Sequence, residues 1–251
     1  IAVNLYNRKG KSLDAALSII KENLEFLKEE GAIEAATVEK SLKLIKMFDD
    51  LELAVKDADY IQEALPEDLE LKQNVFARLD EILPADVIIG SSCSGLKMTD
   101  IARKVKKHPE RCLVAHPTNP PHIVPFMEIA ADKASIEAKQ HLYEFMKSVG
   151  QKPIICKEVY GYVLNRLQIA LFREAFYLLE QDICSLAAVD RAVTDGLGLR
   201  WAFTGPYGVE ELNSANIEEG LTKYKAYFEE GFRELGDFSV ITDGFVQKAN
   251  A

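Results

Sequence analysis

The chain has 251 residues, of which 48% are hydrophobic and 28% are charged, a composition typical of a globular protein with a sizeable core. Its net charge of −10 disfavours general nucleic-acid binding, which usually needs a clustered basic face. The four cysteines show no CxxC pair and no metal-ligand spacing, and no apolar run approaches the roughly 18 residues of a membrane helix. We therefore expect a soluble, cytoplasmic protein with no bound metal and no nucleic-acid or membrane partner.

The hydrophobic pattern in the first part of the chain predicts strands that alternate with amphipathic helices. This alternation indicates a Rossmann-like, doubly wound α/β fold with a parallel sheet. Strands are predicted at residues 1–7, 58–65, 86–94 (running into a small polar loop), 111–117, 124–131 and 152–157, and helices at 12–30, 36–46, 68–83, 96–105 and 135–150.

After Lys157 the pattern changes, and only helices are predicted, at residues 162–181, 186–198 and 215–236. We therefore expect two domains, an α/β domain at 1–157 and an all-α domain at 158–251.

The expected α/β domain lacks one common feature. A dinucleotide-binding sheet normally begins with a strand, a G-x-G-x-x-G loop and a helix, and the sequence contains no such glycine cluster. The element order is nevertheless that of such a sheet entered at its second strand. Either residues precede Ile1, which we expect, or the chain is a different kind of α/β protein.

One histidine stands where a predicted strand ends. His116 closes the run "CLVAH", and Glu128 follows twelve residues later, beyond the stiff turn "PTNPP". If the two strands are neighbours, the carboxylate can hold the imidazole in one tautomer, as a general base requires. A satisfied structural histidine fits the same spacing, so the pattern alone leaves both readings open.

Three other patterns carry the same ambiguity. Ser94, in "SSCSGL", either donates a hydrogen bond to a ligand or belongs to an ordinary turn. Asn165, near the start of a predicted helix, either polarises a substrate oxygen or makes a structural contact. Glu67 and Lys72 flank a strand-to-helix junction, where charges are usually solvated.

Five motifs in order give the chain a family resemblance, namely "IQEALPEDLELKQ", "SSCSGL", "VAHPTNPP", "GYVLNRLQ" and "GLGLRWAFTGP". It resembles the 3-hydroxyacyl-CoA dehydrogenase superfamily, and within it the lambda-crystallin-like branch, which includes L-gulonate 3-dehydrogenase. The resemblance covers nearly the whole chain. It implies that the first domain binds a dinucleotide and that the helical domain binds substrate and forms a homodimer.

The resemblance also implies roles for individual residues. His116 matches the catalytic base, and Glu128 matches its orienting carboxylate. Ser94 and Asn165 match residues that bind the substrate oxygen. The matches to cofactor-binding positions are Glu67 and Lys72, on the ribose and nicotinamide side, and Asn119, beside the nicotinamide.

Two positions refine the expected ligands. Arg200, in "GLGLRWAF", suits a free carboxylate, which a planar guanidinium binds through two hydrogen bonds; a surface ion pair is the alternative. Asn7 stands where NAD-dependent members usually carry an acidic residue, and Arg8 follows it. NAD remains the expected cofactor, and this pair also admits NADP.

We therefore expect an oxidoreductase that transfers hydride between the 3-hydroxyl (3-oxo) carbon of a small hydroxy acid, such as the sugar acid L-gulonate, and a nicotinamide cofactor. The alternatives are a 3-hydroxyacyl-CoA dehydrogenase, which Arg200 disfavours, and a catalytically silent crystallin-like protein.

Overall fold

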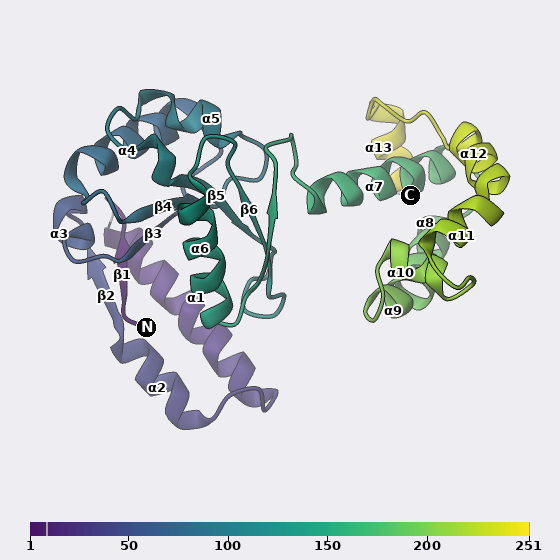
Figure 1. The fold of residues 1–251 in the computed structure, drawn as a ribbon. Coiled ribbons are helices and arrows are strands. Elements are labelled where there is room, and N and C mark those ends of the chain that lie inside the picture. Colours follow the sequence, from purple (N-terminus) through teal and green to yellow (C-terminus); the bar gives the residue numbers. More distant parts are fainter. Residues whose placement is uncertain (9, 251) are drawn as a thin grey trace. The chain divides into compact units, whose positions relative to one another are not determined.

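The computed structural model describes residues 1–8 and 10–250, and the chain divides into two compact units, Ile1–Val163 and Leu164–Ala251. The first unit is a mixed α/β layer structure and the second consists of helices (Figure 1). The Rossmann-like α/β fold with a helical C-terminal part is therefore confirmed.

Two sheets form the centre of the first unit. A five-stranded sheet has the order β3-β4-β5-β6-β7, and β1 pairs in parallel with β2 in a separate two-stranded sheet. All neighbours in the larger sheet are parallel except β5 and β6. The strands are β1 (Val3–Tyr6), β2 (Ile45–Phe48), β3 (Tyr60–Glu63), β4 (Ile88–Ser91), β5 (Cys112–Pro117), β6 (Phe126–Ala130) and β7 (Lys152–Cys156).

Helices cover the larger sheet, so most residues of its central strands are buried. Every residue of β4 is buried, as expected for strands that are covered on both faces. Phe76 and Leu142 are fully buried in this core, from α4 and α6 respectively. The helices of this unit are α1 (Gly10–Glu29), α2 (Ala35–Lys43), α3 (Leu51–Val55), α4 (Leu69–Ile82), α5 (Met98–Ile101) and α6 (Ile136–Ser148), with short 3₁₀ turns at Ala102–Lys104 and Pro109–Arg111.

Local sequence explains where several of these helices begin. Asp50, Asp68 and Ser135 are N-caps whose side chains accept a hydrogen bond from the backbone N–H three residues later, at 2.9 to 3.0 Å. Such caps satisfy donors that have no partner within the helix, each contributing about 1 kcal/mol.

The first unit differs from the prediction at three points. The strand β6 runs antiparallel to β5, whereas a parallel sheet was expected. Two short elements, β2 and α3, were not predicted, because four or five residues do not complete a recognisable hydrophobic period. The helix predicted at 96–105 is one turn of α-helix followed by a 3₁₀ turn.

The second unit contains more helices than the sequence predicted. The segment expected to form one helix at 215–236 divides at Tyr224, and a π-helical turn at Ala192–Leu197 interrupts the segment expected at 186–198. Among the residues described, no helix is long and apolar enough to cross a membrane. The helices are α7 (Leu164–Glu180), α8 (Leu186–Arg191), α9 (Gly198–Trp201), α10 (Pro206–Glu211), α11 (Ile217–Lys223), α12 (Lys225–Glu234) and α13 (Asp243–Ala249).

Candidate active site

The antiparallel pair β5–β6 brings the predicted histidine and carboxylate together. In its register, His116 lies directly opposite Glu128. The connecting turn is closed by a hydrogen bond from the Thr118 N–H to the Phe126 carbonyl, 3.0 Å long. A twelve-residue separation across a hairpin of this length therefore places the two side chains on the same face of the sheet.

Both oxygens of the Glu128 carboxylate are engaged. His116 Nδ1 lies 2.9 Å from Oε2, and the Val163 backbone N–H donates to Oε1 at 2.8 Å. His116 is buried and Glu128 is fully buried. Because a carboxylate oxygen only accepts, His116 carries its proton on Nδ1 and keeps a lone pair on Nε2. This tautomer can accept a proton at Nε2.

The serine loop, residues 91–96, is held by a carboxylate from the loop that follows the neighbouring strand β3. Glu67 Oε1 accepts hydrogen bonds from the backbone N–H groups of Ser94 (3.1 Å), Gly95 (2.9 Å) and Leu96 (3.3 Å). Ser94 itself is exposed. Glu67 therefore fixes the backbone that presents Ser94, a role that the sequence did not predict.

Lys72 forms a buried ion pair beneath the serine loop. Its Nζ donates to both oxygens of Glu63, at 2.9 and 3.1 Å, and to the Leu65 carbonyl at 3.0 Å. Ser91 Oγ donates to Glu63 Oε2 at 2.5 Å, and Glu67 Oε2 lies 3.9 Å from the same ammonium. Lys72 is 1% exposed, so its hydrogen bonds organise the loop's base.

The sequence missed Glu63, although one signal was available. A glutamate inside a predicted strand is costly to bury unless it is paired, and Lys72 nine residues later is a candidate partner.

The remaining cofactor candidates follow strands. Asn7 comes directly after β1, with exposed Arg8 beside it, and Asn119 is exposed in the turn after β5. Thr118 Oγ1 is buried and has no hydrogen-bond partner among the described residues. Amide, hydroxyl and carboxylate groups beyond strand ends suit the hydroxyl and carboxamide groups of a nicotinamide nucleoside. The residues present therefore fit that part of the cofactor, and the described ranges contain no glycine-rich pyrophosphate loop.

Asn165 and Arg200 belong to the helical unit, which is described by itself. Asn165 is the second residue of α7, so it lies in the first turn, where asparagine is better tolerated than in a helix interior. Arg200 is exposed in α9, directly after the π-helical turn. Single π-helical turns occur frequently at functional sites.

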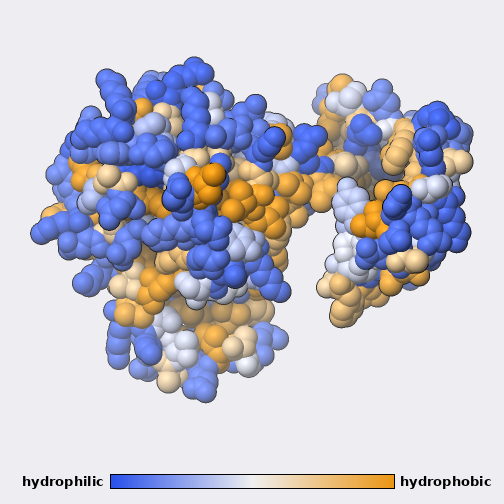
Figure 2. Space-filling model, in the orientation of Figure 1, coloured by the Kyte–Doolittle hydropathy of each residue, from blue (hydrophilic) through white to orange (hydrophobic). Residues whose placement is uncertain are grey.

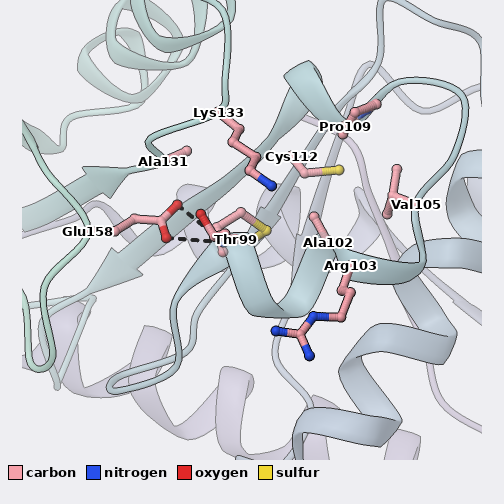
Figure 3. Close-up of a pocket in the computed structure, with 10 residues that line it drawn as sticks. Thr99, Ala102, Arg103, Val105, Pro109, Cys112, Ala131, Lys133 and Glu158 are labelled. Atoms are coloured by element: carbon pink, nitrogen blue, oxygen red, sulfur yellow. Dashed lines mark hydrogen bonds between the residues drawn. The ribbon is translucent and has the colours of Figure 1, made fainter.

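A cavity of about 280 Å³ lies beside α5 (Figure 3), and His116 is not among its described lining residues. The buried Glu158 carboxylate at its wall accepts hydrogen bonds from the Thr99 and Asp132 N–H groups at 2.9 to 3.2 Å. These bonds fasten the segment after β7 to α5, which indicates a structural role. The described lining residues are Met98, Thr99, Ala102, Arg103, Val105, Pro109, Cys112, Ala131, Lys133 and Glu158.

Comparison with known proteins identifies the class. Residues 1–159 match the model of the 3-hydroxyacyl-CoA dehydrogenase NAD-binding domain, and residues 161–240 match the model of that family's C-terminal domain. The fold and these matches define a nicotinamide-dependent oxidoreductase. The chain belongs to the 3-hydroxyacyl-CoA dehydrogenase family, whose members act on 3-hydroxy groups.

Individual relatives agree with this assignment. The mouse (Mus musculus) lambda-crystallin homolog is 37% identical over 236 residues, covering 93% of this chain and 72% of the relative. L-carnitine dehydrogenase from Mesorhizobium japonicum is 42% identical over 177 residues, covering 70% of this chain and 48% of the relative. A solved NAD⁺-dependent dismutase, FHMPC 5-dehydrogenase, superimposes with a TM-score of 0.81 at 25% identity, covering 99% of this chain and 78% of that one.

Proposed function

We propose that the protein oxidises the 3-hydroxyl group of a small free hydroxy acid, or reduces the matching 3-oxo acid, with His116 as the base. The observation that carries this proposal is the Glu128–His116 hydrogen bond at 2.9 Å, which leaves Nε2 free to accept a proton. Membership of a family that acts on 3-hydroxy groups supports the reaction type.

The chain's own residues supply the proton chemistry. In oxidation, His116 Nε2 removes the hydroxyl proton while the hydrogen on the same carbon leaves as hydride, so the C–O single bond becomes C=O. Glu128 stabilises the imidazolium, and Ser94 binds the reacting oxygen. A bound nicotinamide supplies the hydride acceptor. A positioned base of this kind contributes roughly 10²–10⁴ in rate.

We propose that the substrate carries a free carboxylate, which Arg200 binds. Its guanidinium is exposed, and it has no hydrogen bond or ion pair within the part of the chain that the structure describes. The names of two similar proteins point the same way, because L-carnitine is a 3-hydroxy acid and FHMPC is a carboxylic acid. L-gulonate is our specific candidate, from the resemblance to the lambda-crystallin-like branch.

We assign cofactor contacts to Asn7, Arg8 and Asn119, with Glu67 and Lys72 supporting the site through the serine loop and its base. We take NAD as the cofactor, with NADP as the alternative that a neutral Asn7 beside a cationic Arg8 would accept. The carboxamide and hydroxyl groups of the cofactor can form hydrogen bonds with the polar side chains that follow the strand ends.

We further propose a cytoplasmic homodimer in which residues 1–157 bind the cofactor and residues 158–251 bind substrate and form the interface. Hydrophobic side chains on the surface of the helical unit support the dimer (Figure 2). Phe203 is 93% exposed and Leu212 is 68% exposed, which is unusual for a surface that meets only water.

A substrate screen on the full-length protein tests the proposal. Reduced-cofactor absorbance would be followed with L-gulonate, L-carnitine, 3-hydroxybutyrate and acetoacetyl-CoA, each with NAD(H) and NADP(H). Turnover of a free acid supports the proposal. Turnover of acetoacetyl-CoA alone would replace it with an acyl-CoA dehydrogenase, and no turnover at all would favour a silent crystallin-like protein.

A further inference from the structure

The short segment before the helical unit contacts the histidine, its carboxylate and the serine loop. Tyr162 is completely buried, although it lies at the end of that unit. Its ring centroid lies 5.7 Å from that of His116. The next residue, Val163, donates its N–H to Glu128. This segment therefore contacts both the histidine and its carboxylate.

The hydroxyl group of Tyr162 reaches the serine loop. It donates a hydrogen bond to the Leu96 carbonyl and lies 3.3 Å from Cys93 Sγ. Burial raises the pKa of this phenol, so the hydroxyl stays protonated and acts as a donor. Glu67 holds the N–H groups of residues 94–96, and Tyr162 holds the carbonyl of residue 96. The loop is thus fixed from two sides.

The backbone at Tyr162 is in an unusual conformation. Its φ is +47°, and the preceding Gly161 has φ +72°. A left-handed conformation costs a non-glycine residue energy and persists only where the surroundings enforce it. The enforcing contacts are those with His116, the Leu96 carbonyl and Glu128, through the neighbouring amide.

We propose that Tyr162 is a positioning residue for the reaction, whose hydroxyl fixes the serine loop relative to the His116 ring. The ring packs beside the base, and the hydroxyl sets the place of the backbone that follows Ser94. This inference rests on the proposed function, in which Ser94 binds the substrate oxygen.

The test removes one oxygen atom. Tyr162→Phe keeps the ring and deletes only the hydroxyl, and Tyr160→Phe, at a 70% exposed tyrosine of the same segment, is the matched control. Full-length protein would be assayed with the best free acid of the screen, and hydrogen exchange would be measured at the amides of residues 94–96. Tyr162→Phe should lower kcat about tenfold, leave KM within about twofold and accelerate exchange at these amides. Tyr160→Phe should change none of these.

The outcomes separate the two proposals. Unchanged kcat and unchanged exchange in Tyr162→Phe would overturn the positioning role, as would equal losses in both variants. If the wild-type protein turns over no substrate, the proposed function fails. Exchange at residues 94–96 then still decides whether the Tyr162 hydroxyl fixes the loop.

Discussion

Glu128 faces His116 directly across the antiparallel β5–β6 pair and accepts a hydrogen bond from its Nδ1–H group over 2.9 Å. The second carboxylate oxygen accepts the Val163 N–H, so this one buried group links the histidine to the end of the first unit. Neither oxygen can lose its partner without leaving a buried donor unsatisfied, which costs about 1–3 kcal/mol.

Replacing Glu128 by glutamine tests this double role. An amide has one accepting oxygen, so its NH₂ group must face either the His116 Nδ1 proton or the Val163 N–H. We expect kcat to fall roughly 10²-fold or more, with the free energy of unfolding lowered by about 1–3 kcal/mol. Steady-state kinetics and urea denaturation measure both effects. Glu144→Gln, at an exposed glutamate of α6, is the control, and kcat near the wild-type value in Glu128→Gln would contradict the role.

The buried Lys72–Glu63 pair predicts a large effect on stability. Lys72→Met leaves the Glu63 carboxylate buried without its cation, and we expect a loss of about 3–5 kcal/mol in the free energy of unfolding. The double variant Glu63→Gln with Lys72→Met removes both charges and should recover much of that loss. Chemical denaturation of the wild type and the single and double variants measures the coupling. Additive losses would show that the pair does not act as a unit.

Arg200 predicts a change in substrate affinity. Lysine keeps the charge but loses the two parallel hydrogen bonds that a guanidinium makes to a carboxylate. Arg200→Lys should therefore raise KM for a free hydroxy acid about tenfold and leave KM for the cofactor unchanged. Arg191→Lys, at an arginine paired with Asp195 in the same unit, is the control. An unchanged acid KM would remove Arg200 from the substrate site.

The buried Cys112 thiol and the half-buried Cys156 thiol predict a loss of stability at high pH. Burial raises the pKa of Cys112 to about 12 and that of Cys156 to about 11. Unfolded cysteines lose their protons near pH 8.5, so above that pH the folded state binds more protons than the unfolded state. The free energy of unfolding should then fall with pH, by up to about 1.4 kcal/mol per unit for each such thiol.

Denaturation curves between about pH 8 and pH 11 measure this decline. Cys112→Ala should be less stable at neutral pH and lose stability less steeply as the pH rises, with Cys184→Ala as the comparison. Equal slopes in the wild type and Cys112→Ala would contradict the assignment.

The fold class and the approach of His116 to Glu128 could be predicted from the sequence. Alternating strand and helix patterns define an α/β layer, and a stiff turn between two apolar runs suggests neighbouring strands. The direction of β6 could not be predicted, because hydrophobic patterns do not encode whether a strand runs parallel or antiparallel to its neighbour.

The contacts that hold the serine loop were also beyond sequence reasoning. Glu67 binds three backbone N–H groups, and backbone groups leave no mark in a side-chain pattern. Tyr162 was expected to begin the helix predicted at residues 162–181, but α7 begins at Leu164. Its left-handed backbone depends on contacts with strands and loops far away in the sequence.

One variant shows most directly whether His116 is the base of a hydroxy-acid oxidation. His116→Ala in the full-length protein would be assayed by reduced-cofactor absorbance with the best free acid, while cofactor binding is measured separately by fluorescence titration. If His116 is the base, kcat falls roughly 10²–10⁴-fold while the Kd of the cofactor stays within about twofold. Turnover close to that of the wild type would show that His116 is not the base.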